Sequence, residues 1–481
     1  MCSLPAGVYD NSIAASAASK YLSSLFVEVS PSISLLSDGD TAPTRRAKDR
    51  QSLAMRPALS ATLAFFAPAL ALAAAPLFTK LLLTDFVSAG AVCLDGSPVP
   101  LYVRPGSGAD AANVILFFEG GGWCESAEDC VGRAGTALGS SNFTISTMNS
   151  RDLLSPNCTA NPYFCNWSFA YAAYVDGASR SGDAAEPVTV GGTRIFYRGA
   201  RVLNATVAAL LAPGGVGAGM PSLAAAPRLL LSGSSAGGLT TFLHADAIAA
   251  AVRAVNPAVD VRAVPEVGFF IDGASIWGGE HIMTGVFARV AAFQNVTGGL
   301  AAHVNAACVA ATPAAERWRC FMAQYTLPYL TTPTFIVNSM VDEWQTQNVL
   351  APNTVTEPAV TTYAPFAPCI KDPTAGCNAT QAKQWTGYAD QFLDALAAAR
   401  AATPEPLAAR HGGFITSCPI HTTIIGGLSH RIAIRGVTIY DAIVAWMDNK
   451  VPQDTFTIDG KYPANPTCPK PSEVGDAELR L

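Results

Sequence analysis

The chain has 481 residues, of which 50% are hydrophobic and 14% are charged, and its formal net charge is −6. This composition provides apolar material for a large buried core and excludes disorder over most of the length. No lysine–arginine run is longer than the short cluster at 45–50, so we do not expect a nucleic-acid-binding protein.

The N-terminal part contains an apolar segment that is typical of secretion. Residues 1–54 are polar and rich in Ser and Ala, and we expect them to be unstructured or an extension of the gene model. Met55 is followed by one positive charge, an apolar centre and small residues at 71–75, which predicts a signal peptide over 55–75 with Met55 as the true start. A retained signal anchor is the alternative, because the uncharged stretch is long enough to span a bilayer.

From about Thr84 the composition is that of a mixed α/β domain, which we expect to form a single catalytic domain over 84–470, with a tail at 471–481. Apolar runs predict strands that lead into loops or helices, in chain order within 113–124, 169–179, 228–233, 333–345 and 412–421. Helices are predicted from about Arg201 and over 236–255, with helical insertions at 285–325 and 380–405. Alternating strands and helices favour a mainly parallel sheet that helices cover on both faces.

A G-x-S-x-G pattern lies between the strand at 228–233 and the helix at 236–255. Its residues are Gly233, Ser234, Ser235, Ala236 and Gly237. A serine on such a strand-to-helix turn is held in a strained conformation that exposes its hydroxyl group above the sheet. The pattern predicts Ser235 as a nucleophile, whereas an ordinary turn of small residues is the alternative.

A serine nucleophile needs a base, and the base needs an orienting carboxylate. Asp342 and His421 end two later apolar segments, in the chain order Ser, Asp, His that α/β hydrolases use. Glu343 is the alternative acid and His430 the alternative base, next to Arg431 where a surface role is natural. His244 falls inside the helix at 236–255 and is typical of a packed residue.

The glycine loop EGGGW, at 119–123, follows an early strand, where hydrolases place donors for the oxyanion of the tetrahedral intermediate. The amide of Ala236, directly after the nucleophile, is the expected second source of donors.

Cysteines and glycosylation sequons indicate an oxidising compartment. Four close cysteine pairs predict disulfides in preference to zinc sites, because the spacing is wrong for zinc and histidines are scarce: 124/130, 158/165, 308/320 and 369/377. Asn-x-Ser/Thr sequons occur at Asn142, Asn157, Asn166, Asn204, Asn295 and Asn378.

Several blocks, in order and over 92–446, resemble the pectin acetylesterase family, which includes the animal lipid-deacylating enzyme Notum: FFEGGGWC, YVDGASRSGD, IFYRGARV, GSSAGG, VGFFID, VDEWQ and the SC before His421. The resemblance implies an α/β-hydrolase-like serine esterase without metal or organic cofactor. It places the nucleophile on Ser235, the acid on Asp342 and the base on His421. The implied oxyanion donors are the amides of Gly122, Trp123 and Ala236.

The sequence departs from the family's pattern at three positions. Val175 stands where plant members have a cysteine, which leaves Cys93 without its usual partner. Thr422 stands where they have a cysteine after the catalytic histidine, which leaves Cys418 to pair with Cys468. Glu266 replaces the usual aspartate.

We therefore expect a secreted or cell-wall monomer that hydrolyses O-acetyl esters on an acidic polysaccharide such as pectin, and that contacts a membrane only if its N-terminal segment is retained. Cations that could face such a substrate are Arg180, Arg194, Arg198 and Arg201, and structural ion pairs are the alternative for Arg198 and Arg201. The alternatives are a Notum-like lipid or protein-lipid deacylase, and a non-catalytic binding protein on the same scaffold.

Overall fold

The structure, a computed structural model, describes residues 78–148, 151–297, 304–352 and 366–470. The predictions for residues 1–54, for the signal peptide at 55–75 and for the tail at 471–481 lie outside the described residues. The domain begins earlier than predicted, because strand β1 (Phe78–Leu82) lies before Thr84 and Phe78 is buried in the core. Among the described residues, no helix combines the length and hydropathy of a membrane span.

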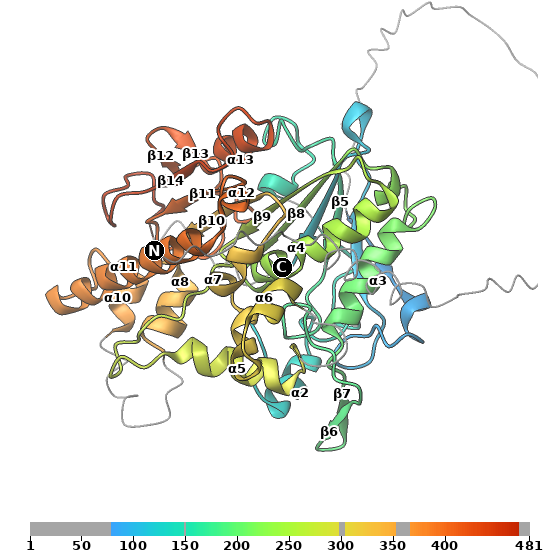
Figure 1. The fold of residues 1–481 in the computed structure, drawn as a ribbon, viewed down its shortest axis with the longest axis horizontal. Coiled ribbons are helices and arrows are strands. Elements are labelled where there is room, and N and C mark those ends of the chain that lie inside the picture. Colours follow the sequence, from blue (N-terminus) through green and yellow to red (C-terminus); the bar gives the residue numbers. More distant parts are fainter. Residues whose placement is uncertain (1–77, 149–150, 298–303, 353–365, 471–481) are drawn as a thin grey trace, which may run out of the picture.

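The described residues form a ten-stranded sheet with the order β14-β11-β10-β9-β8-β3-β5-β2-β1-β4 (Figure 1). Its strands are β1 (Phe78–Leu82), β2 (Pro100–Arg104), β3 (Val114–Phe118), β4 (Thr147–Met148), β5 (Ser168–Ala172), β8 (Arg228–Ser234), β9 (Asp260–Glu266), β10 (Thr334–Ser339), β11 (His411–Thr416) and β14 (Phe456–Ile458). The seven strands from β14 to β5 in this order run parallel, whereas β2, β1 and β4 add antiparallel pairs at one side. The prediction of a mainly parallel α/β-hydrolase-like sheet is confirmed.

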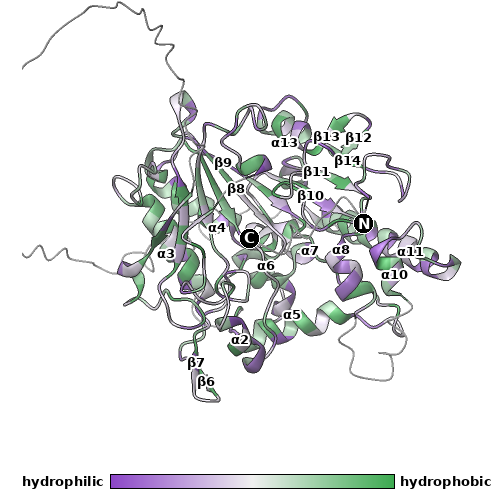
Figure 2. Cartoon of the chain, turned by 180° about the vertical axis from the view of Figure 1, so that it is seen from behind, coloured by the Kyte–Doolittle hydropathy of each residue, from purple (hydrophilic) through white to green (hydrophobic). Residues whose placement is uncertain are grey.

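Helices surround this sheet, and the hydropathy colouring of Figure 2 shows hydrophilic and hydrophobic residues mixed along α5 and α11. The helices are α2 (Ala127–Ala134), α3 (Gly199–Leu211), α4 (Ala236–Val255), α5 (Ile282–Phe293), α6 (Ala306–Ala311), α7 (Ala323–Thr326), α8 (Glu343–Gln345), α10 (Ala367–Lys371), α11 (Ala379–Ala402), α12 (Glu405–Ala408) and α13 (Ile439–Met447). All side chains of β3, β5 and β10 are buried, which shows that both sheet faces are covered there. Two small hairpins, β6–β7 (Val188–Val190, Thr193–Ile195) and β12–β13 (Ala433–Ile434, Val437–Thr438), lie outside the sheet.

The carboxyl ends of the central parallel strands meet at one edge of the sheet. Strand register pairs Phe118 with Gly233, Ser234 with Glu266, and Ser339 with Thr416. Because parallel strands all point the same way, the loops that follow them lie side by side. This edge therefore gathers the glycine loop, the G-x-S-x-G turn and the loops that carry Asp342 and His421.

The strand predicted within 333–345 is shorter than expected. β10 ends at Ser339, and Asp342 lies in the following turn, where its side chain accepts a hydrogen bond from the Gln345 amide and caps α8. An N-cap residue takes a non-helical conformation, which here carries the aspartate past the end of the strand.

All four predicted close cysteine pairs form disulfides, and Cys418 is bonded to Cys468, as the family resemblance implied. Cys93 is buried and is the one free cysteine in the described part of the chain. Burial raises the pKa of its thiol to about 12, so it remains protonated at neutral pH.

Candidate active site

Ser235 lies on a strained turn between β8 and α4. Its φ of 59° and ψ of −125° are sparsely populated for a residue with a side chain, at a cost of about 1–3 kcal/mol. The backbone holds it there, because its amide donates to the Glu266 carbonyl (3.0 Å) and its carbonyl accepts from the Leu239 amide (2.9 Å). This is the local conformation that the G-x-S-x-G pattern predicts for an exposed hydroxyl group.

The glycines of this turn are required by close backbone packing. A Cβ atom on Gly237 would lie 2.0 Å from the Phe118 carbonyl oxygen, and one on Gly233 would lie 2.4 Å from the Gly237 carbonyl oxygen. A Cβ atom on Gly120 would lie 2.7 Å from the Ser235 Cβ atom. The glycine loop after β3 therefore packs directly on the predicted nucleophile.

Asp342 and His421 are brought together. His421 Nδ1 lies 2.8 Å from Asp342 Oδ2, and Asp342 is fully buried. A carboxylate only accepts hydrogen bonds, so Nδ1 carries the proton and Nε2 is the acceptor nitrogen of the neutral ring. Capping of α8 by the other Asp342 oxygen fixes the carboxylate in this orientation.

The alternative residues lie elsewhere. The Glu343 carboxylate accepts from the Gln347 side chain at 3.1 Å, while Asp342 contacts the imidazole. The His430 side chain is 43% exposed and its ring stacks on Tyr440. His244 is buried in α4, with Nε2 2.9 Å from Ser181 Oγ, as expected for a packed histidine.

The glycine loop presents its amides in a defined direction. Arg133 donates to the Gly121 carbonyl (2.6 Å), and the Tyr174 hydroxyl donates to the Gly122 carbonyl. Because C=O and the following N–H point in opposite directions across a planar trans peptide, the amides of Gly122 and Trp123 face away from these donors. Gly122 adopts a φ of 66°, which a glycine tolerates without strain.

Ala236 begins α4, so its amide has no acceptor within the helix.

The Trp123 side chain is held by a hydrogen bond to Ser179. Its indole Nε1 donates to Ser179 Oγ at 2.9 Å, and the Ser179 amide donates to the Tyr174 hydroxyl at 3.1 Å. The contact between Trp123 and Ser179, 56 residues apart, has no local sequence signal, and Tyr174 and Arg133 were not predicted to support the site.

Glu119, at the start of the glycine loop, accepts from the Tyr174 amide at 2.7 Å. Desolvation raises the pKa of Glu119 from an ordinary 4.5 to about 7, so between these values the folded protein binds more protons than the unfolded chain. The free energy of unfolding contributed by this group therefore falls as pH rises from 4.5 to 7.

Glu119→Gln removes this pH-dependent term and retains an acceptor for the Tyr174 amide. We expect the Tm of the variant minus that of the wild type to be about 2 °C more positive at pH 8 than at pH 5. Thermal unfolding at both pH values measures this difference, and an equal difference at the two values would refute the assignment.

The predicted role of Arg180 facing substrate is wrong. The Arg180 side chain is fully buried, and its guanidinium group donates to the carbonyls of Ala172 and Ala173. Arg198 is also buried, and Arg201 pairs with Asp183 at 2.6 Å, so both serve structural contacts. Arg194 is exposed on the β6–β7 hairpin.

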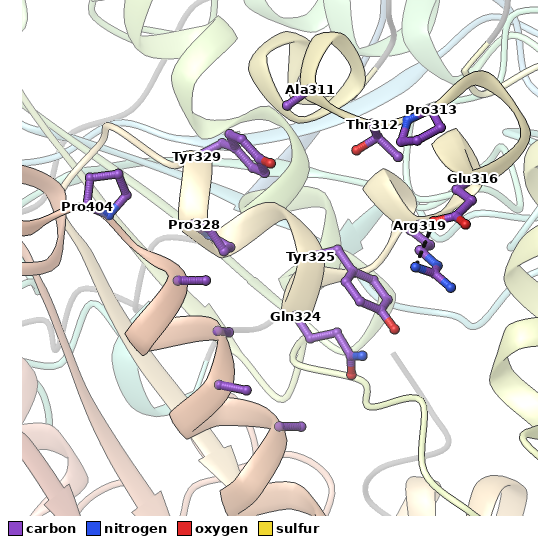
Figure 3. Close-up of a pocket in the computed structure, with 14 residues that line it drawn as sticks. Ala311, Thr312, Pro313, Glu316, Arg319, Gln324, Tyr325, Pro328, Tyr329 and Pro404 are labelled. Atoms are coloured by element: carbon purple, nitrogen blue, oxygen red, sulfur yellow. Dashed lines mark ion pairs between the residues drawn. The ribbon is translucent and has the colours of Figure 1, made fainter. Parts of the chain in front are cut away.

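A cavity of about 490 Å³ lies apart from the residues predicted to be catalytic. Figure 3 shows it between α11 and the segment that carries Tyr325 and Tyr329. None of Ser235, Asp342 and His421 lines it.

The sequence matches the pectinacetylesterase family over residues 73–469. The chain belongs to the pectinacetylesterase family. It is 34% identical to pectin acetylesterase 11 of Arabidopsis thaliana over 80% of this chain and 91% of that protein, and 33% identical to pectin acetylesterase 7 of the same plant with the same coverage. It is 29% identical to the human palmitoleoyl-protein carboxylesterase NOTUM over 53% of this chain and 49% of that protein. The names of these relatives describe ester hydrolases. The prediction that this chain is an ester hydrolase is therefore confirmed.

Proposed function

We propose that this chain is a serine carboxylesterase that removes O-acetyl groups from a cell-wall polysaccharide such as pectin, with Ser235, Asp342 and His421 as its catalytic triad. The observation that carries the proposal is the 2.8 Å hydrogen bond between His421 Nδ1 and buried Asp342, at the sheet edge where Ser235 occupies a strained turn. The names of the plant relatives, which share most of their length with this chain, support the substrate class.

In the first half of the reaction, the Ser235 hydroxyl attacks the ester carbonyl while His421 Nε2 accepts its proton. Asp342 stabilises the imidazolium that forms and keeps its tautomer. The amides of Gly122, Trp123 and Ala236 donate to the oxyanion of the tetrahedral intermediate. The His421 imidazolium then donates this proton to the leaving sugar oxygen as its bond to the carbonyl carbon breaks, which frees the sugar hydroxyl and leaves an acetyl group on Ser235.

In the second half, His421 removes a proton from water, and the resulting hydroxide attacks the acyl-enzyme carbonyl. The same amides stabilise the second oxyanion. Collapse of this intermediate returns the proton to Ser235 and releases acetate.

Aromatic packing beside the site supports a short acyl group. The Trp123 ring centroid lies 4.9 Å from that of Phe270 and 5.6 Å from that of Trp344, and the Trp344 ring lies 6.4 Å from that of His421. Rings at these separations are in direct contact and leave little room for an alkyl chain between them. Acetyl fits this arrangement better than a fatty acyl group.

Trp344→Ala tests this assignment, because it removes a partly exposed ring from the cluster. We expect kcat/KM for 4-nitrophenyl butyrate, relative to the acetate ester, to rise at least about tenfold. Trp318→Ala, which removes another partly exposed indole outside this cluster, is the matched control. An unchanged ratio in Trp344→Ala would show that this ring does not limit acyl length.

The substrate itself is tested by acetate release from acetylated pectin, acetylated xylan and 4-nitrophenyl esters of increasing chain length. We expect release from pectin and poor hydrolysis of the palmitate ester. Rapid palmitate hydrolysis without acetate release from pectin would instead favour a lipid deacylase, and no turnover of any ester would favour a binding protein.

We further propose a secreted location. The five disulfides within the described residues need an oxidising compartment, and the sequon residues Asn142, Asn157 and Asn378 are exposed.

A further inference from the structure

Glu266 contacts both the turn that carries Ser235 and the loop that carries His421. The proposed reaction depends on the relative position of these two segments. Glu266 is the last residue of β9, is fully buried, and pairs in register with Ser234 of β8. Its carbonyl accepts from the Ser235 amide at 3.0 Å. Its carboxylate oxygen Oε2 accepts from the Ser234 hydroxyl at 2.6 Å. One residue thus contacts both the predicted nucleophile and its neighbour.

The other carboxylate oxygen of Glu266 contacts the loop that carries His421. Oε1 accepts from the Thr423 amide, from the Thr423 hydroxyl (2.7 Å) and from the Ile424 amide (2.5 Å). These residues lie two and three positions after His421, and both are buried. Burial raises the pKa of Glu266, whereas the hydrogen bonds from Ser234, Thr423 and Ile424 lower it.

The segment before His421 is held by separate contacts. The Ser339 hydroxyl donates to the Cys418 carbonyl at 2.6 Å, and Cys418 is bonded to Cys468. Glu266 therefore supplies an anchor on the following side of the histidine, and this anchor also contacts the serine turn.

We propose that Glu266 is a positioning residue that sets the placement of His421 relative to Ser235. This inference rests on the proposed function. Misplacement of a catalytic group by about 1 Å can lower the rate about 10²-fold. Loss of the Glu266 contacts should therefore lower kcat more than it weakens substrate binding.

The test compares Glu266→Gln with Glu266→Met in the full disulfide-bonded chain. Gln keeps an acceptor for the loop amides and can donate to the Ser234 hydroxyl, whereas Met keeps the length and loses every acceptor. Active sites are titrated with a fluorophosphonate, and kcat and KM for 4-nitrophenyl acetate are expressed per titrated site. We expect kcat per site to fall at least about tenfold in Glu266→Met with KM nearly constant, and less than about threefold in Glu266→Gln.

Asp246→Leu is the matched control. The Asp246 carboxylate accepts from the amides of Thr331 and Thr332 and from the Thr332 hydroxyl, far along α4 from the serine turn. Its loss lowers stability, and therefore the number of active sites, but leaves kcat per site unchanged. Wild-type kcat per site in Glu266→Met would overturn the inference, whereas a wild-type protein that is not labelled would overturn the proposed function.

If Glu266→Met does not fold, Ser234→Ala, Thr423→Val and their double variant decide the question. Each single change removes one hydroxyl donor from one side of the bridge. A two- to fivefold loss of kcat per site in the single variants, a size that the loss of one hydrogen bond can produce, supports the inference. Unchanged kcat per site in all three variants would overturn it.

Discussion

Replacing Ser235 with Ala is expected to reduce kcat on 4-nitrophenyl acetate by about 10⁶-fold, because loss of a triad nucleophile leaves the oxyanion donors and binding alone. Folding should be retained, because Ala also carries a Cβ atom and so adds no backbone strain beyond that of Ser at the φ and ψ angles of this turn. Turnover and thermal unfolding measured on one preparation separate the two effects.

Ser232→Ala is the matched control for this change. Ser232 lies on strand β8, is buried, and its hydroxyl donates to the Val264 carbonyl at 2.7 Å. We expect a small loss of stability and wild-type turnover. Comparable activity in Ser235→Ala and Ser232→Ala would remove Ser235 from the mechanism.

Asp342→Asn should lower kcat about 10⁴-fold with the fold intact, because an amide that donates to Nδ1 favours the wrong imidazole tautomer. The side-chain oxygen of Asn can still accept from the Gln345 amide, so capping of α8 is retained. Steady-state kinetics and circular dichroism measure the two quantities.

Glu343→Gln provides the comparison for this carboxylate, since it neutralises the adjacent acid while the pair of Asp342 and His421 is untouched. We expect near wild-type turnover. If Glu343→Gln were severely impaired and Asp342→Asn were not, the orienting acid would be Glu343.

Much of the fold could be predicted from local patterns. The apolar run before Gly233 and the helical pattern after Ser235 correspond to β8 and α4, with bounds that differ by at most one residue. The strand before Asp342 was predicted too long, because apolarity continues through Met340 and Val341 into a turn. Periodicity does not distinguish a buried turn from the end of a buried strand.

For the candidate site, chain order and spacing predicted the approach of Asp342 to His421, 79 residues apart. The contacts of Glu266 were not predicted, although its departure from the family's pattern was visible, because its partners at 423–424 become neighbours only when β9 and the loop after β11 are placed together. Arg180 was a candidate for facing substrate for a related reason, because its local sequence does not show that its side chain is buried.

In the proposed reaction Ser235, and no neighbouring hydroxyl, becomes acylated. The most direct measurement is peptide mapping by mass spectrometry after the disulfide-bonded protein reacts with a fluorophosphonate. We expect one stoichiometric adduct on Ser235 that is absent from Ser235→Ala. An adduct on Ser234, or no adduct on folded protein that still hydrolyses esters, would contradict it.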